Sequence, residues 1–104
     1  MSLAQEWFIA CLFFQETDEN IHLRTHIIGY LSGLCNVDIA CVMTQRENEV
    51  KGSLRTRKEG IDVNVLAQKF GGWGHKKASW FELDATIVDN QLTWKGKVYT
   101  PLDF

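Results

Sequence analysis

A glycine-rich stretch followed by a histidine holds the residue types in this sequence that could do chemistry. Gly71, Gly72 and Gly74 surround Trp73 and directly precede His75. Glycine lets backbone N–H groups approach a ligand with no Cβ in the way, and successive N–H groups can bind an anion. Histidine titrates near neutral pH, so it can carry a positive charge beside a phosphate. The stretch therefore predicts an anion site. The alternative is a loop that only ends a helix and contains an incidental histidine, because such a loop would have the same sequence pattern.

A basic segment upstream offers further contacts to an anion. If residues 50–57 form a strand, alternation places Lys51, Ser53, Arg55 and Arg57 on one face. Arg55 carries a planar, always charged guanidinium that suits two phosphate oxygens, and the hydroxyl of Ser53 can help. We expect Ser53 and Arg55 to be spaced to hold one ligand.

The charge distribution favours a small anionic ligand. The chain has a net charge of −2, yet residues 46–77 hold eight Lys or Arg against four Asp or Glu, a local charge of +4. The rest of the chain therefore carries −6. A local basic face on an acidic protein suits a small anion better than a long duplex. A solvated surface of Lys and Arg is the alternative interpretation.

The first half of the chain predicts a strand, a helix and a hairpin. Residues 7–14 are a continuous apolar run of strand length, for which periodicity alone does not exclude a helix. Thr17 or Asp18 can cap an amphipathic helix that extends to about Gly33. Residues 37–43 and 50–56 are strand-like on either side of a polar turn, which is typical of an antiparallel hairpin.

The second half predicts a short helix and two more strands. Asp62 is a suitable N-cap, and Gly71 a suitable end, for a helix that starts after residue 62. Residues 75–79 could add one helical turn, and residues 80–88 and 91–100 read as strands joined at Asp89 and Asn90. The order strand-helix-strand-strand-helix-strand-strand predicts an α+β fold. It would have a mixed sheet of about five strands with two helices packed on one face.

Composition and motifs exclude several kinds of site. The chain has 104 residues and one proline, so we expect residues 1–104 to form a single domain. Cys11, Cys35 and Cys41 lack zinc-site spacing, and we expect them to be reduced and mostly buried. His22 and His26 are four residues apart, but without an acidic third ligand we expect them to face solvent rather than a metal. No apolar stretch approaches the roughly 20 residues needed to span a bilayer, and we find no secretion signal, which indicates a cytoplasmic protein with no membrane partner.

The central part of the chain resembles a known family. The residues that carry the resemblance are Gly52-Ser53-Leu54-Arg55-Thr56, Ile61-Asp62-Val63, Leu66-Ala67-Gln68-Lys69-Phe70 and Gly71-Gly72-Trp73-Gly74-His75-Lys76-Lys77-Ala78-Ser79. This order resembles the DHH-associated C-terminal domain, which is the substrate-binding domain of DHH-family phosphoesterases. These enzymes include the bifunctional oligoribonucleases that dephosphorylate 3′-phosphoadenosine 5′-phosphate. The close match covers residues 50–83.

The resemblance implies a ligand and assigns roles to residues. The ligand would be a nucleotide or the end of a short single-stranded RNA, with its phosphate held by Arg55 and His75. Gly71, Gly72 and Gly74 would shape the turn, and Ser53 would help.

The resemblance also implies a partner domain. The parent protein would have a DHH catalytic domain that holds two manganese ions and makes it a manganese-dependent phosphoesterase. This chain has no Asp-His-His sequence. We therefore expect it to have no catalytic residue, no metal ligand and no cofactor of its own, and to be inactive alone.

Two tryptophans depart from the family's pattern. Trp73 and Trp80 stand where the family prefers glycine. Three roles stay open for Trp73: it stacks on a base, it plugs the pocket, or it faces elsewhere in a structural role. If the two indoles alter the pocket, the chain would instead be an interaction domain that keeps the fold without the ligand.

Overall fold

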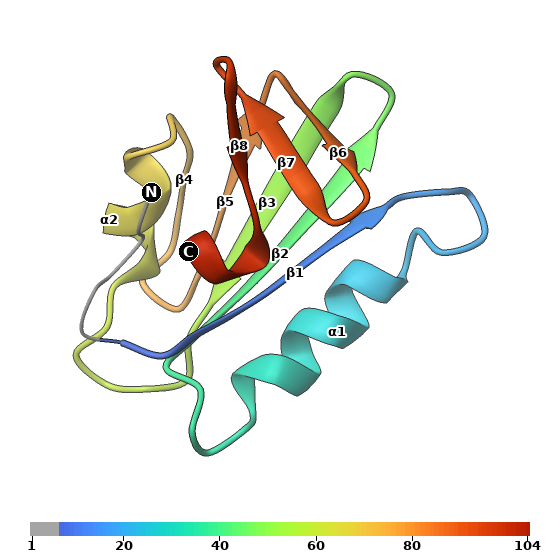
Figure 1. Cartoon of the computed structure of the whole chain (residues 1–104). Coiled ribbons are helices and arrows are strands. Elements are labelled where there is room, and N and C mark those ends of the chain that lie inside the picture. The colour runs from blue at the N-terminus through green and yellow to red at the C-terminus, as the bar shows by residue number, and fades with distance from the viewer. Residues whose placement is uncertain (1–6) are drawn as a thin grey trace.

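A five-stranded mixed sheet forms the centre of the fold (Figure 1). The computed structural model describes residues 7–104. The sheet has the order β1-β2-β3-β5-β4, in which β1 runs parallel to β2 and the other neighbours are antiparallel. Its strands are β1 (Ile9–Gln15), β2 (Ile39–Arg46), β3 (Glu49–Arg55), β4 (Trp73–Gly74) and β5 (Ala78–Leu83). The α+β class and the mixed five-stranded sheet are confirmed.

The helices α1 (Leu23–Ser32) and α2 (Val63–Gln68) pack on opposite faces of this sheet. Ile28 of α1 packs with Ala40 and Val42 of β2, whereas α2 belongs to the core that contains Ile39 and Cys41 of the same strand. Successive side chains of a strand point to opposite faces. The expectation that both helices share one face therefore does not hold, because β2 is buried on both sides.

A second, three-stranded sheet covers the α2 face. It consists of β6 (Ala85–Val88), β7 (Gln91–Trp94) and β8 (Lys97–Tyr99), and a short 3-10 helix, η1 (Pro101–Asp103), follows. The sequence predicted long strands at 80–88 and 91–100, but Asp84 separates β5 from β6. Lys95 and Gly96, both with positive φ, separate β7 from β8. The turn expected at Asp89 and Asn90 is confirmed, with positive φ at both residues.

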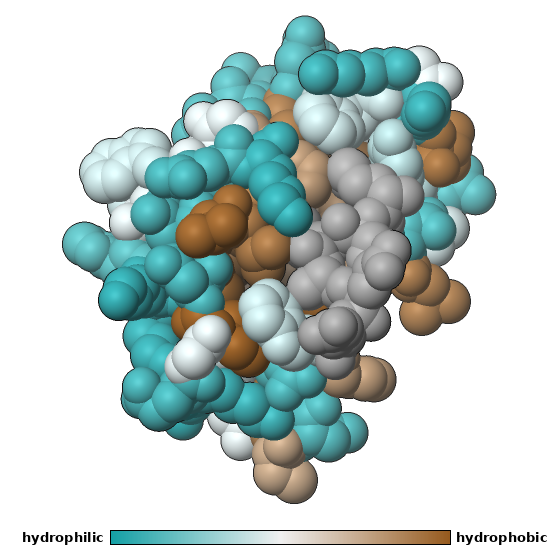
Figure 2. Space-filling view, turned by 90° about the vertical axis from the view of Figure 1, so that its left-hand side faces the viewer, coloured by the Kyte–Doolittle hydropathy of each residue, from teal (hydrophilic) through white to brown (hydrophobic). Residues whose placement is uncertain are grey.

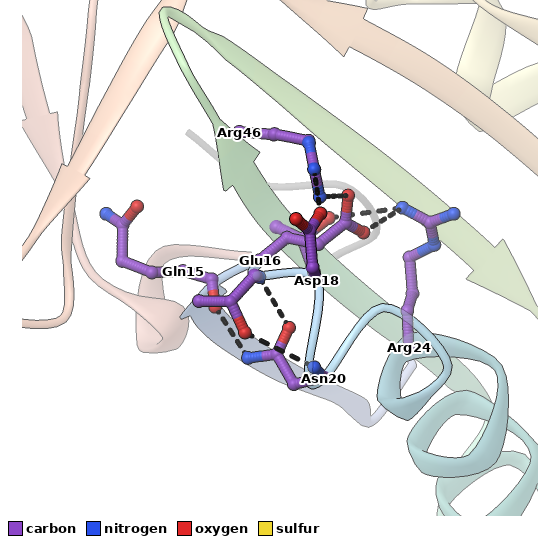
Figure 3. Close-up of polar contacts among 8 residues, drawn as sticks. Gln15, Glu16, Asp18, Asn20, Arg24 and Arg46 are labelled. Carbon is purple, nitrogen blue, oxygen red and sulfur yellow. Dashed lines mark hydrogen bonds and ion pairs between the residues drawn. The ribbon is translucent and has the colours of Figure 1, made fainter.

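Helix α1 starts later than the sequence predicted. Residues 18–22 form turns, and α1 begins at Leu23. The side chain of Asn20 donates to the carbonyl of Gln15 at 2.9 Å and accepts from the amide of Thr17 at 2.6 Å (Figure 3). These local bonds give the backbone an alternative to the first helical turn.

Helix α2 has the ends that the sequence predicted. The side chain of Asp62 accepts from the amide of Asn64 at 2.9 Å at the start of α2. At its end Gly71 has a φ of 77°, and the amides of Gly71 and Gly72 donate to the carbonyls of Gln68 and Ala67. This pair of bonds is a Schellman motif, in which glycine takes the left-handed position at no steric cost.

The surface on the α2 side is mostly hydrophilic, with one hydrophobic patch near the centre of the view and further hydrophobic side chains at its margins (Figure 2). Behind it the main core joins the five-stranded sheet, α2 and the second sheet. Its largest buried side chains include Phe81, Met43, Leu54 and Leu92.

Candidate functional site

The predicted site residues lie on the part of the sheet that α1 leaves open. Helix α1 packs over β2, where Ala40 and Val42 are buried beneath Ile28. The same face of β3, β5 and β4 continues beyond the helix, and we call it the open face. Residues directly opposite each other in antiparallel strands share a face, so the pairing register shows which side chains are neighbours there.

The first row of the open face contains Arg55, Ala78 and His75. Arg55 of β3 is opposite Ala78 of β5. Ala78 in turn exchanges two backbone hydrogen bonds with His75, of 2.8 and 3.3 Å. Neighbouring strands are about 4.8 Å apart, so the backbones of Arg55 and His75 are roughly 10 Å apart. Only the methyl group of Ala78 lies between them in this row. The Arg55 side chain lines the cavity described below, whereas His75 is exposed and is not among the residues that line it.

This row also corrects the predicted local structure around His75. Residues 75–79 do not form a helical turn; instead Lys76 and Lys77 are the tip of a hairpin that joins β4 to β5. His75 is therefore placed by strand pairing rather than by the start of a helix.

The second row contains Ser53, Trp80 and Trp73. Ser53 of β3 is opposite Trp80 of β5, which is opposite Trp73 of the edge strand β4. The two indole rings pack with centroids 4.9 Å apart and planes 54° apart. Trp73 is 60% exposed. Neither indole lies in the row between Arg55 and His75.

A cavity of about 270 Å³ lies between α1 and the residues of these rows that belong to β3 and β5. Arg24, Thr25 and Ile28 of α1 form one wall. The opposite side is lined by Lys51, Ser53, Leu54, Arg55, Ala78, Ser79 and Trp80. No acidic residue belongs to this lining, whereas three cationic side chains do, so the cavity is suited to an anion.

Only one of the three cationic side chains that line this cavity forms an ion pair within residues 7–104. Arg24 donates to the Glu16 carboxylate at 3.3 Å and to the Thr44 hydroxyl at 3.2 Å. Across residues 7–104, Lys51 and Arg55 take part in no ion pair. The Arg55 guanidinium lies beside α1, since a Cβ placed on Gly29 would be 3.6 Å from its Nη1 atom. Lys51 is directly opposite Glu82 in the β3–β5 ladder, so the uncompensated charge of the cavity lies at Arg55.

The neighbouring hollow, of about 350 Å³, is lined by three carboxylates, by two arginines that already have partners, and by Lys51. Glu16 pairs with Arg24 and, at 3.6 Å, with Arg46, which also bonds Asp18 (Figure 3). Here the carboxylates neutralise the guanidinium groups. An added anion therefore fits this hollow less well than the cavity beside Arg55.

The far end of the open face is acidic. Glu47, Glu49, Glu82 and Asp84 lie where the β2–β3 hairpin meets the end of β5. A hydrogen bond to Glu82 and repulsion from the other carboxylates raise the pKa of Glu49. The charge along the open face thus changes from positive at Arg55 to negative at Glu82, which would orient an anionic ligand.

The backbone amides of the glycine-rich stretch are bonded within the protein. Gly74 donates to the side-chain carbonyl of Asn64 at 3.0 Å, and His75 donates to the Ala78 carbonyl. Gly71 and Gly72 donate to the end of α2, as described above. These amides are therefore not the free donors that an anion site needs, and the sequence held no signal for Asn64 as their partner.

The glycines are instead required by close backbone packing. A Cβ on Gly72 would lie 2.0 Å from the Trp80 carbonyl oxygen, and a Cβ on Gly74 would lie 2.6 Å from the Ser79 Cα. No side chain fits at those distances. Gly72 and Gly74 thus shape the turn and hold β4 against β5, which fixes the position of His75.

Of the predicted site residues, only Ser53 and Arg55 line the cavity, whereas His75, Trp73 and the three glycines do not. Arg57 is exposed and donates to the Gly29 carbonyl at 3.2 Å. His22 and His26 are exposed, and within residues 7–104 no group of three His, Cys, Asp or Glu could hold a metal ion. None of the helices in this range could cross a membrane.

The cysteines are free but not all buried. Cys41 is buried, Cys11 opposite it in the β1–β2 ladder is half-buried, and Cys35 is exposed. Burial and a hydrogen bond with Cys11 raise the pKa of the Cys41 thiol. The expectation that the cysteines are mostly buried therefore holds for only part of the set.

Sequence reasoning missed the contribution of α1 to the site. Arg24 and Thr25 line the cavity, yet they are about 30 residues before Arg55 in the chain, and their types carry no specific signal. Sequence reasoning also missed Ala78, which lies between Arg55 and His75. Its small side chain points to a role only once the strand pairing shows which residues are its neighbours.

The fold and this basic, aromatic face define an α+β domain with an open sheet face suited to a small anionic ligand. The family model of the DHHA1 domain matches residues 8–92, and the chain belongs to that family. This confirms the resemblance to the DHH-associated domain.

Comparison with solved structures agrees on the fold. The chain is similar to the C-Ala domain of the alanyl-tRNA synthetase from Aquifex aeolicus, with a TM-score of 0.59 and 11% sequence identity. The similarity covers 77% of this chain and 81% of that one. At this identity it concerns the fold alone. No curated protein matches the sequence.

Proposed function

We propose that this domain binds the phosphate of a nucleotide or of a short oligonucleotide end in the cavity between α1 and β3. The observation that carries the proposal is the first row, in which Arg55 and His75 share a face with only Ala78 between them. Membership of the DHHA1 family and the uncompensated charge at Arg55 support it.

Each side chain would have a distinct role. The Arg55 guanidinium would bind two phosphate oxygens at once, and a ring N–H of His75 would donate to a third. The Ser53 hydroxyl would donate a hydrogen bond to the phosphate, and Lys51 would add positive charge at longer range. Gly71, Gly72 and Gly74 would contribute by placing His75 rather than by touching the ligand.

We further propose that the domain serves a DHH-type phosphoesterase, in which the DHH domain would hold the manganese ions and do the chemistry. Within the described range, the chain offers no metal cluster. The domain's own part is therefore to hold and orient the substrate. Adding Mn²⁺ and a dinucleotide to the isolated chain should release no phosphate or mononucleotide.

Calorimetric titration with 3′-phosphoadenosine 5′-phosphate tests the binding proposal. Arg55→Ala and His75→Ala should each weaken binding by about tenfold or more, because a hydrogen bond to a charged group contributes about 1.5–3 kcal/mol. Arg57→Ala is the matched control, since it removes the same charge two residues beyond Arg55 and outside the cavity. Unchanged affinity in both Arg55 and His75 variants would discard the pocket and favour the ligand-free interaction domain.

A further inference from the structure

The second row of the open face presents aromatic surface next to the proposed phosphate site. Trp80 lines the cavity together with Arg55 and Ser53, and Trp73 extends this row to the edge of the sheet. Rows on one face of a strand are two residues apart, which is about 7 Å. A group bound at the first row therefore lies beside the indoles.

The exposure of Trp73 needs an explanation. Trp73 packs against Trp80, yet 60% of its surface remains exposed. β4 has only two residues and lies at the sheet edge, so no neighbouring strand covers the outer indole. Tryptophan usually buries much of its large apolar surface, and aromatic rings left exposed in a basic groove are typical of surfaces on which bases stack.

Charge fixes the direction in which a ligand would lie. The first row is positive at Arg55, whereas Glu82 and Glu49 lie at the opposite end of the open face. A phosphate is attracted to the first row and repelled from the acidic end. An uncharged planar ring attached to that phosphate would then lie over the second row.

We propose that Trp80 and Trp73 form a stacking platform that selects phosphates carrying a nucleobase over phosphates that lack one. This inference rests on the proposed phosphate site and adds the ligand class: nucleotides and single-stranded ends, rather than sugar phosphates or inorganic phosphate. Trp80 holds the inner end of the platform, and Trp73 supplies the exposed outer ring.

The test compares two ligands that differ only in the base. Adenosine 5′-monophosphate and ribose 5-phosphate are titrated into the whole chain by calorimetry. The wild-type protein should bind the nucleotide at least about fivefold more tightly, as stacking on one aromatic side chain provides. Trp73→Ala should remove most of this preference while the affinity for ribose 5-phosphate stays the same, and Trp73→Phe should retain much of it.

Matched variants keep the test decisive. Tyr30→Ala removes an aromatic ring that is 70% exposed on α1 and outside the cavity, and it should leave the preference unchanged. Trp80→Phe tests the inner ring with less risk to folding than alanine. Far-ultraviolet circular dichroism should show that each variant is folded.

Each alternative outcome has a separate meaning. Equal affinity of the wild type for both ligands, or tighter nucleotide binding by Trp73→Ala, would overturn the platform, and the second result would show that the indole blocks the pocket. In both cases the phosphate site itself would stand. Failure of the wild type to bind either ligand would overturn the proposed function and the platform together.

Discussion

Glu49 lies in a group of carboxylates that makes its ionisation unfavourable. The hydrogen bond with Glu82 and repulsion from Glu82, Asp84 and Glu47 raise its pKa. A carboxyl whose pKa is higher in the folded than in the unfolded state lowers stability once the pH exceeds that raised pKa. Glu49→Gln should therefore raise the melting temperature at about pH 7. The gain should shrink as the pH falls through the raised pKa of Glu49.

Asp38 is a control for this prediction, because its pKa is shifted in the opposite direction. The Lys58 ammonium donates to it at 2.7 Å and the Phe8 amide at 2.8 Å, and these bonds lower the pKa of Asp38. Its contribution to stability is present above the pKa of the unfolded chain and is lost as the pH falls through the lowered pKa. Asp38→Asn should thus destabilise the protein near neutral pH, with a loss that fades in acid. The same sign for both variants in thermal melts would contradict this electrostatic account.

At the residue scale, local patterns predicted side-chain direction but not hydrogen-bond partners. Alternation in β3 placed Ser53 and Arg55 on one face, as the structure has them, because the strand period is a local property. The glycine amides were predicted to be free, yet their acceptors come from Asn64 and from the end of α2. Such partners depend on how elements meet, which no local pattern contains.

The effect of replacing glycine with alanine depends on the element in which the glycine lies. Gly29 is inside α1, where a Cβ would touch only Arg55 at 3.6 Å, whereas a Cβ on Gly52 in β3 would lie 2.2 Å from the Phe81 ring. Gly29→Ala should stabilise the protein by about 0.5–1 kcal/mol through helix propensity. Gly52→Ala should destabilise it by about 1–3 kcal/mol through overpacking.

Urea unfolding checks both glycine variants. The midpoint should rise for Gly29→Ala and fall for Gly52→Ala, with similar slopes because the surface exposed on unfolding is unchanged. A fall for Gly29→Ala would mean that contact with Arg55 outweighs the helical preference. Since the two substitutions are chemically identical, opposite shifts would assign the difference to location alone.

At the element scale, the sequence predicted the existence of elements better than their limits. The β2–β3 hairpin and the ends of α2 follow from turn and capping residues. The break at Asp84 and the late start of α1 do not, because they depend on packing between the two sheets and on bonds made by Asn20. The sequence also did not predict on which face of the sheet each helix packs, since a strand that is buried on both sides can be covered by a helix on either side.

At the scale of the whole molecule, net charge is a poor guide to the ligand. The chain carries −2, but a group of its carboxylates lies at one end of the open face and the unpaired Arg55 at the other. Screening acts over about 8 Å at physiological salt, so a ligand in the cavity experiences mainly the cations that line it.

The parallel pairing of β1 with β2 influences how the molecule assembles and opens. The hairpin ladders join strands that follow one another directly, whereas each residue of β1 pairs with one 30 positions later, a separation similar to that between β3 and β5. Unlike β3 and β5, β1 is an edge strand with a single neighbour. Closing that long connection costs entropy before any contact forms, so β1 should dock after the hairpins. Native-state amide exchange should then show β1 opening at lower free energy than β2 and β3. Equal protection of all three strands would indicate that the sheet opens only as one cooperative unit.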